Sequence, residues 1–135
     1  MLTVTAFDHV VLNVRDVERS AAWYARVLGM ARRDVISANG IRRTSMTFGA
    51  MMLNLRPVDM DTDVWFTGAA AVAGSDDLCF VSEASPDAVV RHLASCGVAI
   101  VLGPVARRGA RGEMTSVYCR DPDGNLIEIA RYGST

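Results

Sequence analysis

A carboxylate inside an apolar strand is the first residue of this chain that points to chemistry. Glu128 stands between Ile127 and Ile129, directly after the turn segment DPDG. Because strand side chains alternate between faces, Glu128 shares one face with Leu126 and Ala130. A buried carboxylate needs a cation, a metal ion or a hydrogen-bond donor beside it. The segment therefore predicts either such a pair or, on an edge strand, a glutamate that faces water.

Two arginines near glycines are candidates for holding an anionic substrate. Arg108 and Arg111 fall within residues 104–112, which Pro104 and the glycines predict to be a loop. A guanidinium group binds a carboxylate or a phosphate through two parallel hydrogen bonds. The alternative is a basic loop that is simply solvated.

Composition excludes several function classes. The chain has 135 residues, of which 50% are hydrophobic and 21% charged, so it can form one compact domain with a sizeable core. The net charge of -1 gives no electrostatic basis for binding nucleic acid. No apolar run reaches the ~20 residues of a membrane span. We expect neither nucleic acid nor a membrane as a partner.

The basic and sulfur-containing residues narrow the chemistry further. All basic side chains other than histidine are arginine, which excludes lysine Schiff bases and the phosphate-loop lysine. Cys79, Cys96 and Cys119 match no zinc or redox spacing, so we expect reduced thiols. Reduced cysteines and the lack of an export signal predict a cytoplasmic protein.

These candidates must be positioned by elements that the hydrophobic periodicity indicates. In the first part of the chain, the pattern predicts a strand, a helix and three strands. Their expected ranges are 5–14, 17–28, 30–37, 41–48 and 50–56. Residues 57–75 are rich in Asp, Gly and Ala and are interpreted as a connector, in which Trp65 and Phe66 pack onto something.

The same order then starts again. The expected ranges are a strand at 76–82, a helix at 86–96 and strands at 98–103, 113–120 and 125–132. The chain is thus an internal repeat of strand–helix–strand–strand–strand modules, at residues 1–56 and 76–135. We predict an α+β fold in which two tandem βαβββ modules form curled mixed sheets around a cleft, all within one domain.

The repeat relates residues that could do chemistry. One offset carries His9 onto Asp77, and a longer one carries Asn54 onto Glu128. Positions related in this way are expected to face each other across the cleft.

Four segments resemble one superfamily. They are FDHVVLNVRDVERSAAWYARVLGM at 7–30, LNLRP at 53–57, GSDDLCF at 74–80 and SVYCRDPDGNLIEIARY at 116–132. Together they resemble the vicinal-oxygen-chelate superfamily (VOC domains), which includes glyoxalase I, extradiol dioxygenases, and fosfomycin- and bleomycin-resistance proteins. The resemblance is closer to the small single-chain glyoxalase-domain group often labelled "virulence protein", and it implies one glyoxalase-like domain over residues 1–135.

The resemblance implies a divalent metal site. His9 and Glu128 match the first-strand and last-strand ligands, whereas Asp77 stands where many metal-binding members have His. Asn54 stands where glyoxalase I-like members have Glu, so it is expected to bind the substrate or a water instead. One histidine with two carboxylates still makes a three-ligand site for Mn, Fe, Zn, Ni or Mg.

The implied function is a lyase or isomerase that acts on a small oxygen-chelating substrate. Glu128 would serve as the catalytic base, with Asp77 as the other candidate. Ser116 and Tyr118 match residues that contact substrate in fosfomycin-resistance proteins, so they and Arg111 are expected to bind substrate.

Two other functions remain open. A metal-free binding protein of the resistance type would use the same cleft, and an extradiol dioxygenase would need a second histidine that is missing here. We also expect a homodimer, since such sheets usually pair.

Overall fold

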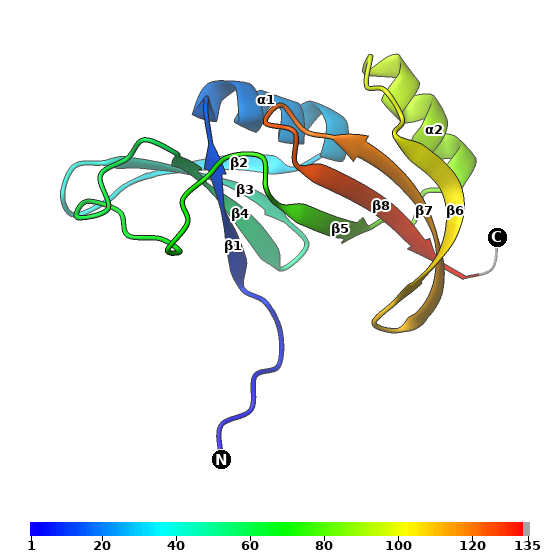
Figure 1. The fold of residues 1–135 in the computed structure, drawn as a ribbon, viewed down its shortest axis with the longest axis horizontal. Coiled ribbons are helices and arrows are strands. Elements are labelled where there is room, and N and C mark those ends of the chain that lie inside the picture. Colours follow the sequence, from blue (N-terminus) through cyan, green and yellow to red (C-terminus); the bar gives the residue numbers. More distant parts are fainter. Residues whose placement is uncertain (134–135) are drawn as a thin grey trace. The chain divides into compact units, whose positions relative to one another are not determined.

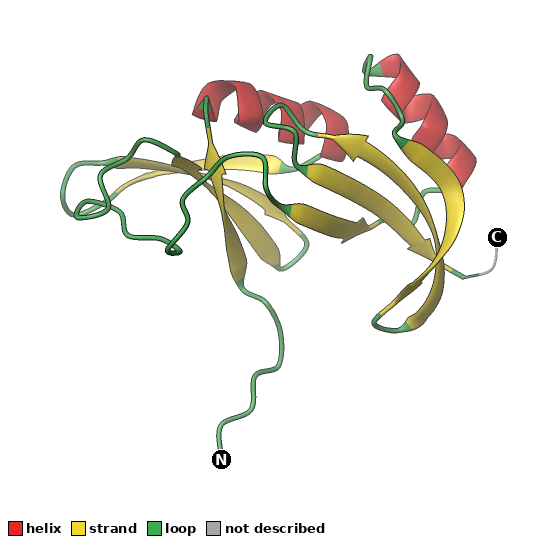
Figure 2. Ribbon diagram, in the orientation of Figure 1, coloured by secondary structure: helices red, strands yellow, loops and turns green. Residues whose placement is uncertain are grey.

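The computed structural model describes residues 1–133. The chain divides into two compact units, Met1–Ala73 and Gly74–Thr135. Each unit has the predicted order of strand, helix and three strands, and each forms one four-stranded mixed sheet (Figures 1 and 2). The predicted α+β class with two βαβββ modules is therefore confirmed.

The first unit carries one helix on one face of its sheet (Figure 1). Its elements are β1 (His9–Val14), α1 (Val17–Leu28), β2 (Ala31–Ile36), β3 (Arg42–Phe48) and β4 (Met51–Pro57). The strand order is β1-β4-β3-β2, with β1 parallel to β4 and the other pairs antiparallel. The predicted first strand, 5–14, started too early, because β1 begins at His9.

Local sequence signals fix both ends of α1. The Asp16 carboxylate accepts a hydrogen bond from the Arg19 backbone N–H at 3.0 Å, as an N-cap does. Gly29 ends the helix with φ +68°, a left-handed conformation that costs glycine little. The helix packs on β2, β3 and β4. The core side chains between helix and sheet include Leu12, Val14, Ala21, Tyr24, Val27, Met46, Leu53 and Leu55.

The second unit repeats this arrangement. Its elements are β5 (Asp77–Val81), α2 (Pro86–Ser95), β6 (Leu102–Gly109), β7 (Gly112–Arg120) and β8 (Leu126–Tyr132). The strand order is β5-β8-β7-β6, with β5 parallel to β8. Helix α2 begins at the Ser85 cap and Pro86, as expected, and it packs on β6, β7 and β8.

The predicted loop at 104–112 is wrong. Residues 104–109 belong to β6, and the hairpin to β7 turns through Ala110 and Arg111 alone. The misleading signals were Gly103 and Pro104, which here form a bulge between the paired positions Leu102 and Val105. A proline is tolerated at a bulge or in an edge strand, because its missing N–H breaks no ladder there.

The connector is held by a buried arginine of the first unit. Arg56 has no exposed surface. Its guanidinium donates to the carbonyl oxygens of Trp65 at 2.9 Å and Met60 at 2.7 Å, and to Asn13 Oδ1 at 2.8 Å. Trp65 is buried, whereas Phe66 is 86% exposed. The connector is therefore anchored although it contains no helix or strand.

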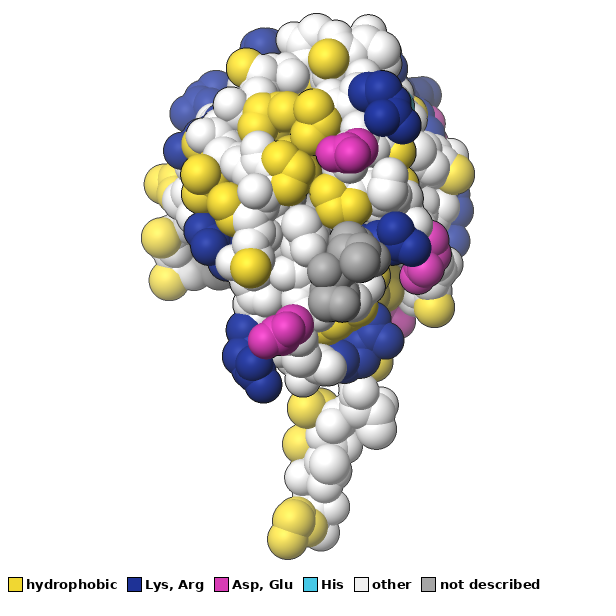
Figure 3. All heavy atoms as spheres, turned by 90° about the vertical axis from the view of Figure 1, so that its right-hand side faces the viewer, with side chains coloured by type: hydrophobic (Ala, Val, Ile, Leu, Met, Phe, Trp, Pro, Cys, Tyr) yellow, Lys and Arg dark blue, Asp and Glu magenta, His cyan; other side chains and the backbone are white. Residues whose placement is uncertain are grey.

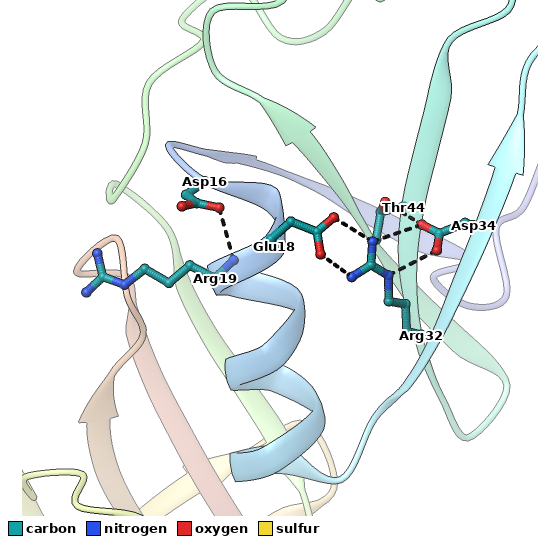
Figure 4. A network of polar contacts seen from close by, with 6 residues as sticks. All are labelled: Asp16, Glu18, Arg19, Arg32, Asp34 and Thr44. Carbon is teal, nitrogen blue, oxygen red and sulfur yellow. Dashed lines mark hydrogen bonds and ion pairs between the residues drawn. The ribbon is translucent and has the colours of Figure 1, made fainter.

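A polar network joins α1 to the sheet on the helix side (Figure 4). Arg32 donates to both carboxylate oxygens of Glu18, at 2.6 and 2.8 Å, and to Asp34 at 3.0 Å. The pKa of Glu18 is lowered mainly by the hydrogen bond from Arg32. The pKa of Asp34 is lowered first by the Thr44 hydroxyl and then by Arg32.

This network predicts how stability depends on pH. A carboxyl whose folded pKa is lowered adds stability above its ordinary pKa, here 4.5 for Glu18 and 3.8 for Asp34, and loses it as pH falls through the folded value. We expect Arg32→Gln to lower the urea midpoint at about pH 6 and to have little effect near about pH 2, where both carboxyls are protonated.

The matched control is Arg19→Gln in the same helix, because the Arg19 side chain points away from Glu18 in Figure 4. A midpoint difference for Arg32→Gln that is the same at both pH values would contradict this prediction.

The surface offers no concentrated basic area in the view of Figure 3. Arginine side chains are spread around that face among acidic and hydrophobic ones. Residues 1–8 extend as an arm from β1, with Leu2 89%, Val4 82% and Phe7 73% exposed (Figure 1). Across residues 1–133, no helix has the length and apolar character needed to cross a membrane.

Candidate functional site

The second unit contains a pocket of about 310 Å³ against its sheet. Glu128 of β8, Tyr118 of β7 and Asp77 of β5 line it, so three strands of one sheet contribute polar groups. The remaining lining residues are Val101, Leu102, Arg107, Arg120 and Leu126. The pocket thus combines an apolar wall with acidic, basic and hydroxyl groups, which is typical of small-molecule sites.

Glu128 is the most buried of the acidic groups in this pocket. It keeps 9% of its surface exposed. The Ser116 hydroxyl donates to Glu128 Oε2 at 2.6 Å, in a buried hydrogen bond. Cys79 and Tyr118 lie directly opposite Glu128 on the two neighbouring strands. The choice between a buried and a water-facing Glu128 is therefore resolved in favour of burial.

Tyr118 links Glu128 to an arginine that was not predicted. Arg107 Nε donates to the Tyr118 hydroxyl oxygen at 3.0 Å, and the guanidinium lies 5.5 Å from the centre of the ring. Burial raises the pKa of Tyr118, the hydrogen bond from Arg107 lowers it, and contact with Glu128 raises it, with a net upward shift. Tyr118 is thus a neutral hydroxyl at pH 7, and it lies directly opposite Glu128 in the β7–β8 register.

Cys79 is a third neutral group next to Glu128. Partial burial of its thiol, together with the neighbouring charge of Glu128, raises the pKa of Cys79 to about 11. The thiol is therefore protonated at pH 7, which makes it a poor nucleophile.

The turn before β8 fixes Glu128 in its register. Asp121 Oδ1 accepts from the backbone N–H groups of Asp123 and Asn125, both at 2.9 Å. The fully buried Asn125 donates to Asp121 Oδ2 at 2.8 Å and accepts from the Asp76 N–H at 2.9 Å. The DPDGN segment thereby joins β8 to the start of β5, and it holds Glu128 and Asp77 on one sheet.

The other predicted site residues lie in the first unit. His9 is the first residue of β1, and its Nδ1 lies 2.8 Å from Asp8 Oδ1, which leaves Nε2 for another partner. Asn54 is on β4 and accepts at Oδ1 from the Ser45 hydroxyl at 2.6 Å. Residues 1–133 contain no group of three or more His, Cys, Asp or Glu side chains that could hold a metal ion. The set of His9, Asp77 and Glu128 remains a prediction.

The two arginines chosen from the sequence have other surroundings. Arg111 stacks at 4.3 Å over the Tyr132 ring, and its backbone N–H donates to the Tyr132 hydroxyl at 3.1 Å. Arg108 lies 3.9 Å from Glu113. Neither lines the pocket beside Glu128, where Arg107 does. Arg107 pairs with Met114 in the β6–β7 hairpin. Because residues 104–112 were predicted to be a loop, this pairing was not considered.

Comparisons with known proteins agree with this fold. A model of the Glyoxalase/Bleomycin resistance protein/Dioxygenase superfamily matches residues 6–129. Virulence protein STM3117 of Salmonella typhimurium is 37% identical over 131 residues, which cover 97% of this chain and 87% of that protein. Its crystal structure matches with a TM-score of 0.87 over 98% of this chain and 100% of that one.

Two more distant relatives have names that state an enzymatic activity. Metallothiol transferase FosB of Shouchella clausii is 27% identical over 128 residues, covering 93% of this chain and 80% of that protein. The crystal structure of lactoylglutathione lyase from Agrobacterium tumefaciens matches with a TM-score of 0.69 at 22% identity, over 96% of this chain and 95% of that one. This last likeness concerns the fold alone.

Proposed function

Because this chain belongs to the glyoxalase/bleomycin resistance protein/dioxygenase superfamily, we propose that it is a divalent-metal-dependent enzyme of lyase or isomerase type. Its substrate would be a small molecule that offers two adjacent oxygen atoms. His9, Asp77 and Glu128 would hold the ion. A bound divalent ion supplies Lewis-acid stabilisation of negative charge on substrate oxygens.

The observation that carries this proposal is the environment of Glu128. Its carboxylate is buried at the pocket wall and contacts the neutral groups of Ser116, Tyr118 and Cys79. Among the described residues it forms no ion pair with an arginine or histidine. A buried negative charge without a positive partner is costly, and a divalent cation would compensate it.

The chemistry of the donor set fits such an ion. The contact between Asp8 and His9 Nδ1 resembles the carboxylate–histidine arrangement that orients a metal-binding ring, and Nε2 would be the nitrogen that holds the ion. Asp77 lines the same pocket as Glu128 and adds a second carboxylate. One imidazole and two carboxylates suit Mn, Fe, Zn, Ni or Mg. The similarity to a metallothiol transferase also supports a metal-dependent reaction.

The side chains around the pocket would orient the substrate and move a proton. Glu128 is the candidate base, because a carboxylate at the pocket wall can accept a proton from a bound substrate. Arg107 donates to the Tyr118 hydroxyl oxygen, and both residues line the pocket with Glu128, so they would position substrate oxygens beside the base.

Metal-free ligand binding is a second candidate. The aliphatic side chains of Val101, Leu102 and Leu126, together with the Tyr118 ring, form an apolar wall that could bind a ligand without an ion.

Metal content distinguishes the two functions. We expect elemental mass spectrometry of protein purified without a chelating column to find close to one divalent ion per chain. We expect Glu128→Gln and His9→Ala to lose it. Glu113→Gln and His92→Ala should keep it, because Glu113 is an exposed residue of β7 and His92 lies on α2.

Stability provides a second readout. A bound ion stabilises the folded state, so added Mn²⁺ or Zn²⁺ should raise the melting temperature of metal-depleted wild type but not of Glu128→Gln. Wild type without metal and without this shift would refute the metalloenzyme and favour the metal-free binding protein.

A further inference from the structure

The face of the first sheet opposite α1 is basic. Strand alternation and register place the side chains at 9, 11, 13, 31, 33, 35, 43, 45, 47, 52, 54 and 56 on it. The ionisable groups at these strand positions are His9, Arg33, Arg43 and Arg56, and none is acidic. Arg56 is buried under the connector, which leaves the other three for contact with a ligand.

Arg43 has an unusual environment for an arginine. Its guanidinium lies 4.3 Å from the centre of the buried Trp65 ring. Its Nε is the one buried side-chain nitrogen or oxygen without a hydrogen-bond partner among the described residues that are not exposed. A buried donor without an acceptor costs free energy, so a group that binds beside it would recover part of this cost.

Arg33 stands next to Arg43 on the same face. It lies opposite Ser45 in the β2–β3 register, whereas Arg43 lies opposite Val35, which makes the two arginines diagonal neighbours. Arg33 Nη2 contacts Met52 Sδ at 3.5 Å, and a thioether is a weak acceptor. Two neighbouring guanidinium groups repel each other unless an anion lies between them.

Asn54 adds a donor to this pair. Its Oδ1 accepts from Ser45, so its amide is oriented with the Nδ2 hydrogens free to donate elsewhere. Ser45 is also the residue opposite both Arg33 on β2 and Asn54 on β4. The strand positions around Ser45 therefore offer donors from three adjacent strands, and none of these positions is acidic.

We propose that Arg33, Arg43 and Asn54 form an oxyanion-binding site for the carboxylate, phosphonate or phosphate group of a small organic ligand. Stacking on Trp65 holds the Arg43 guanidinium in place, and planar guanidinium groups bind such anions through paired hydrogen bonds. All three residues belong to the first unit, and the proposed site involves no metal ion. Its failure is therefore distinguishable from failure of the proposed enzyme.

The test is a titration of the metal-depleted full chain with methylphosphonate, acetate or inorganic phosphate, each against chloride at equal ionic strength. Calorimetry measures affinity, and NMR follows the arginine Nε–H resonances. We expect saturable binding of at least one oxyanion and a shift of the Arg43 signal. Comparison of the three probes identifies which kind of oxyanion the site prefers.

Variants assign the site to residues. Arg43→Gln and Arg33→Gln should each weaken binding by about tenfold, because each removes charge-assisted hydrogen bonds. Arg42→Gln is the matched control and should change affinity less than about twofold, because Arg42 precedes Arg43 on β3 and faces the other side. If Arg43→Gln does not fold, the exposed Arg33→Gln carries the test.

Three results would overturn the proposal. They are no saturable binding beyond that of chloride, unchanged affinity in Arg33→Gln and Arg43→Gln, or an equal loss of affinity in Arg42→Gln.

Discussion

Replacing Gly103 by alanine is expected to lower the free energy of unfolding by about 3–5 kcal/mol, the sum of backbone strain and overpacking. A Cβ at this position would lie 2.5 Å from the Ser116 carbonyl oxygen and 3.0 Å from Val117 Cα, both backbone atoms that cannot rotate away. Gly103 also has φ +111°, which residues with a side chain rarely adopt.

The same change should reach the pocket. Relief of the clash would shift the Ser116 backbone, and the Ser116 hydroxyl is a hydrogen-bond donor to Glu128. We therefore expect Gly103→Ala to reduce metal or ligand affinity as well as stability.

Gly112→Ala is the control for this experiment. Gly112 has φ +120°, but no atom lies within 4 Å of the position that its Cβ would take. It should lose only the strain, about 1–3 kcal/mol, and leave affinity unchanged. Urea unfolding and metal content measure both effects. Equal losses of stability in the two variants would show that the contact with Ser116 contributes nothing.

Arg56→Ala should destabilise the first unit by about 4 kcal/mol, because it creates a cavity and leaves buried acceptors without a donor. Arg56 is completely buried, and it donates to Trp65 O, Met60 O, Asn13 Oδ1 and, at 3.3 Å, Pro57 O. All four acceptors are uncharged, so the loss comes from hydrogen bonds and packing rather than from a broken ion pair.

Urea unfolding followed by tryptophan fluorescence measures this loss, since Trp65 lies beside Arg56. Arg42→Ala, an exposed arginine at the start of β3, should change stability by no more than about 0.5 kcal/mol. A loss below about 1 kcal/mol in Arg56→Ala would mean that water replaces the guanidinium at the four acceptors.

Local signals predicted most of the fold. The Asp16 cap, Gly29 and the Ser85–Pro86 pair each determine a helix end through contacts within a few residues, so they can be read from the sequence. The strand at 102–109 could not be predicted from the sequence, because Gly103 and Pro104 have the same local signature in a bulge as in a loop. Only pairing with the distant β7 distinguishes the two.

The candidate site followed the same rule. Alternation puts Ser116 and Tyr118 on one face of their strand, and the β7–β8 register brings that face next to Glu128. Arg107 was missed because a loop has no alternation of faces, whereas the β6–β7 register places Arg107 on the same face as Ser116 and Tyr118. Arg43 was missed for a different reason: its stacking partner Trp65 lies in a connector without periodicity, so no sequence pattern relates the two.

The anchored connector also determines where this polypeptide could be split into two fragments. The sequence repeat ends near residue 56, yet Arg56 binds carbonyl groups at 60 and 65, and the first compact unit extends to Ala73. A half-length polypeptide that stops at 56 would keep the guanidinium and lose most of its acceptors. One that stops at 73 would keep them all. A split-protein design should therefore keep the connector on the same fragment as the first module. The same holds for a single module taken as the ancestor of a duplication.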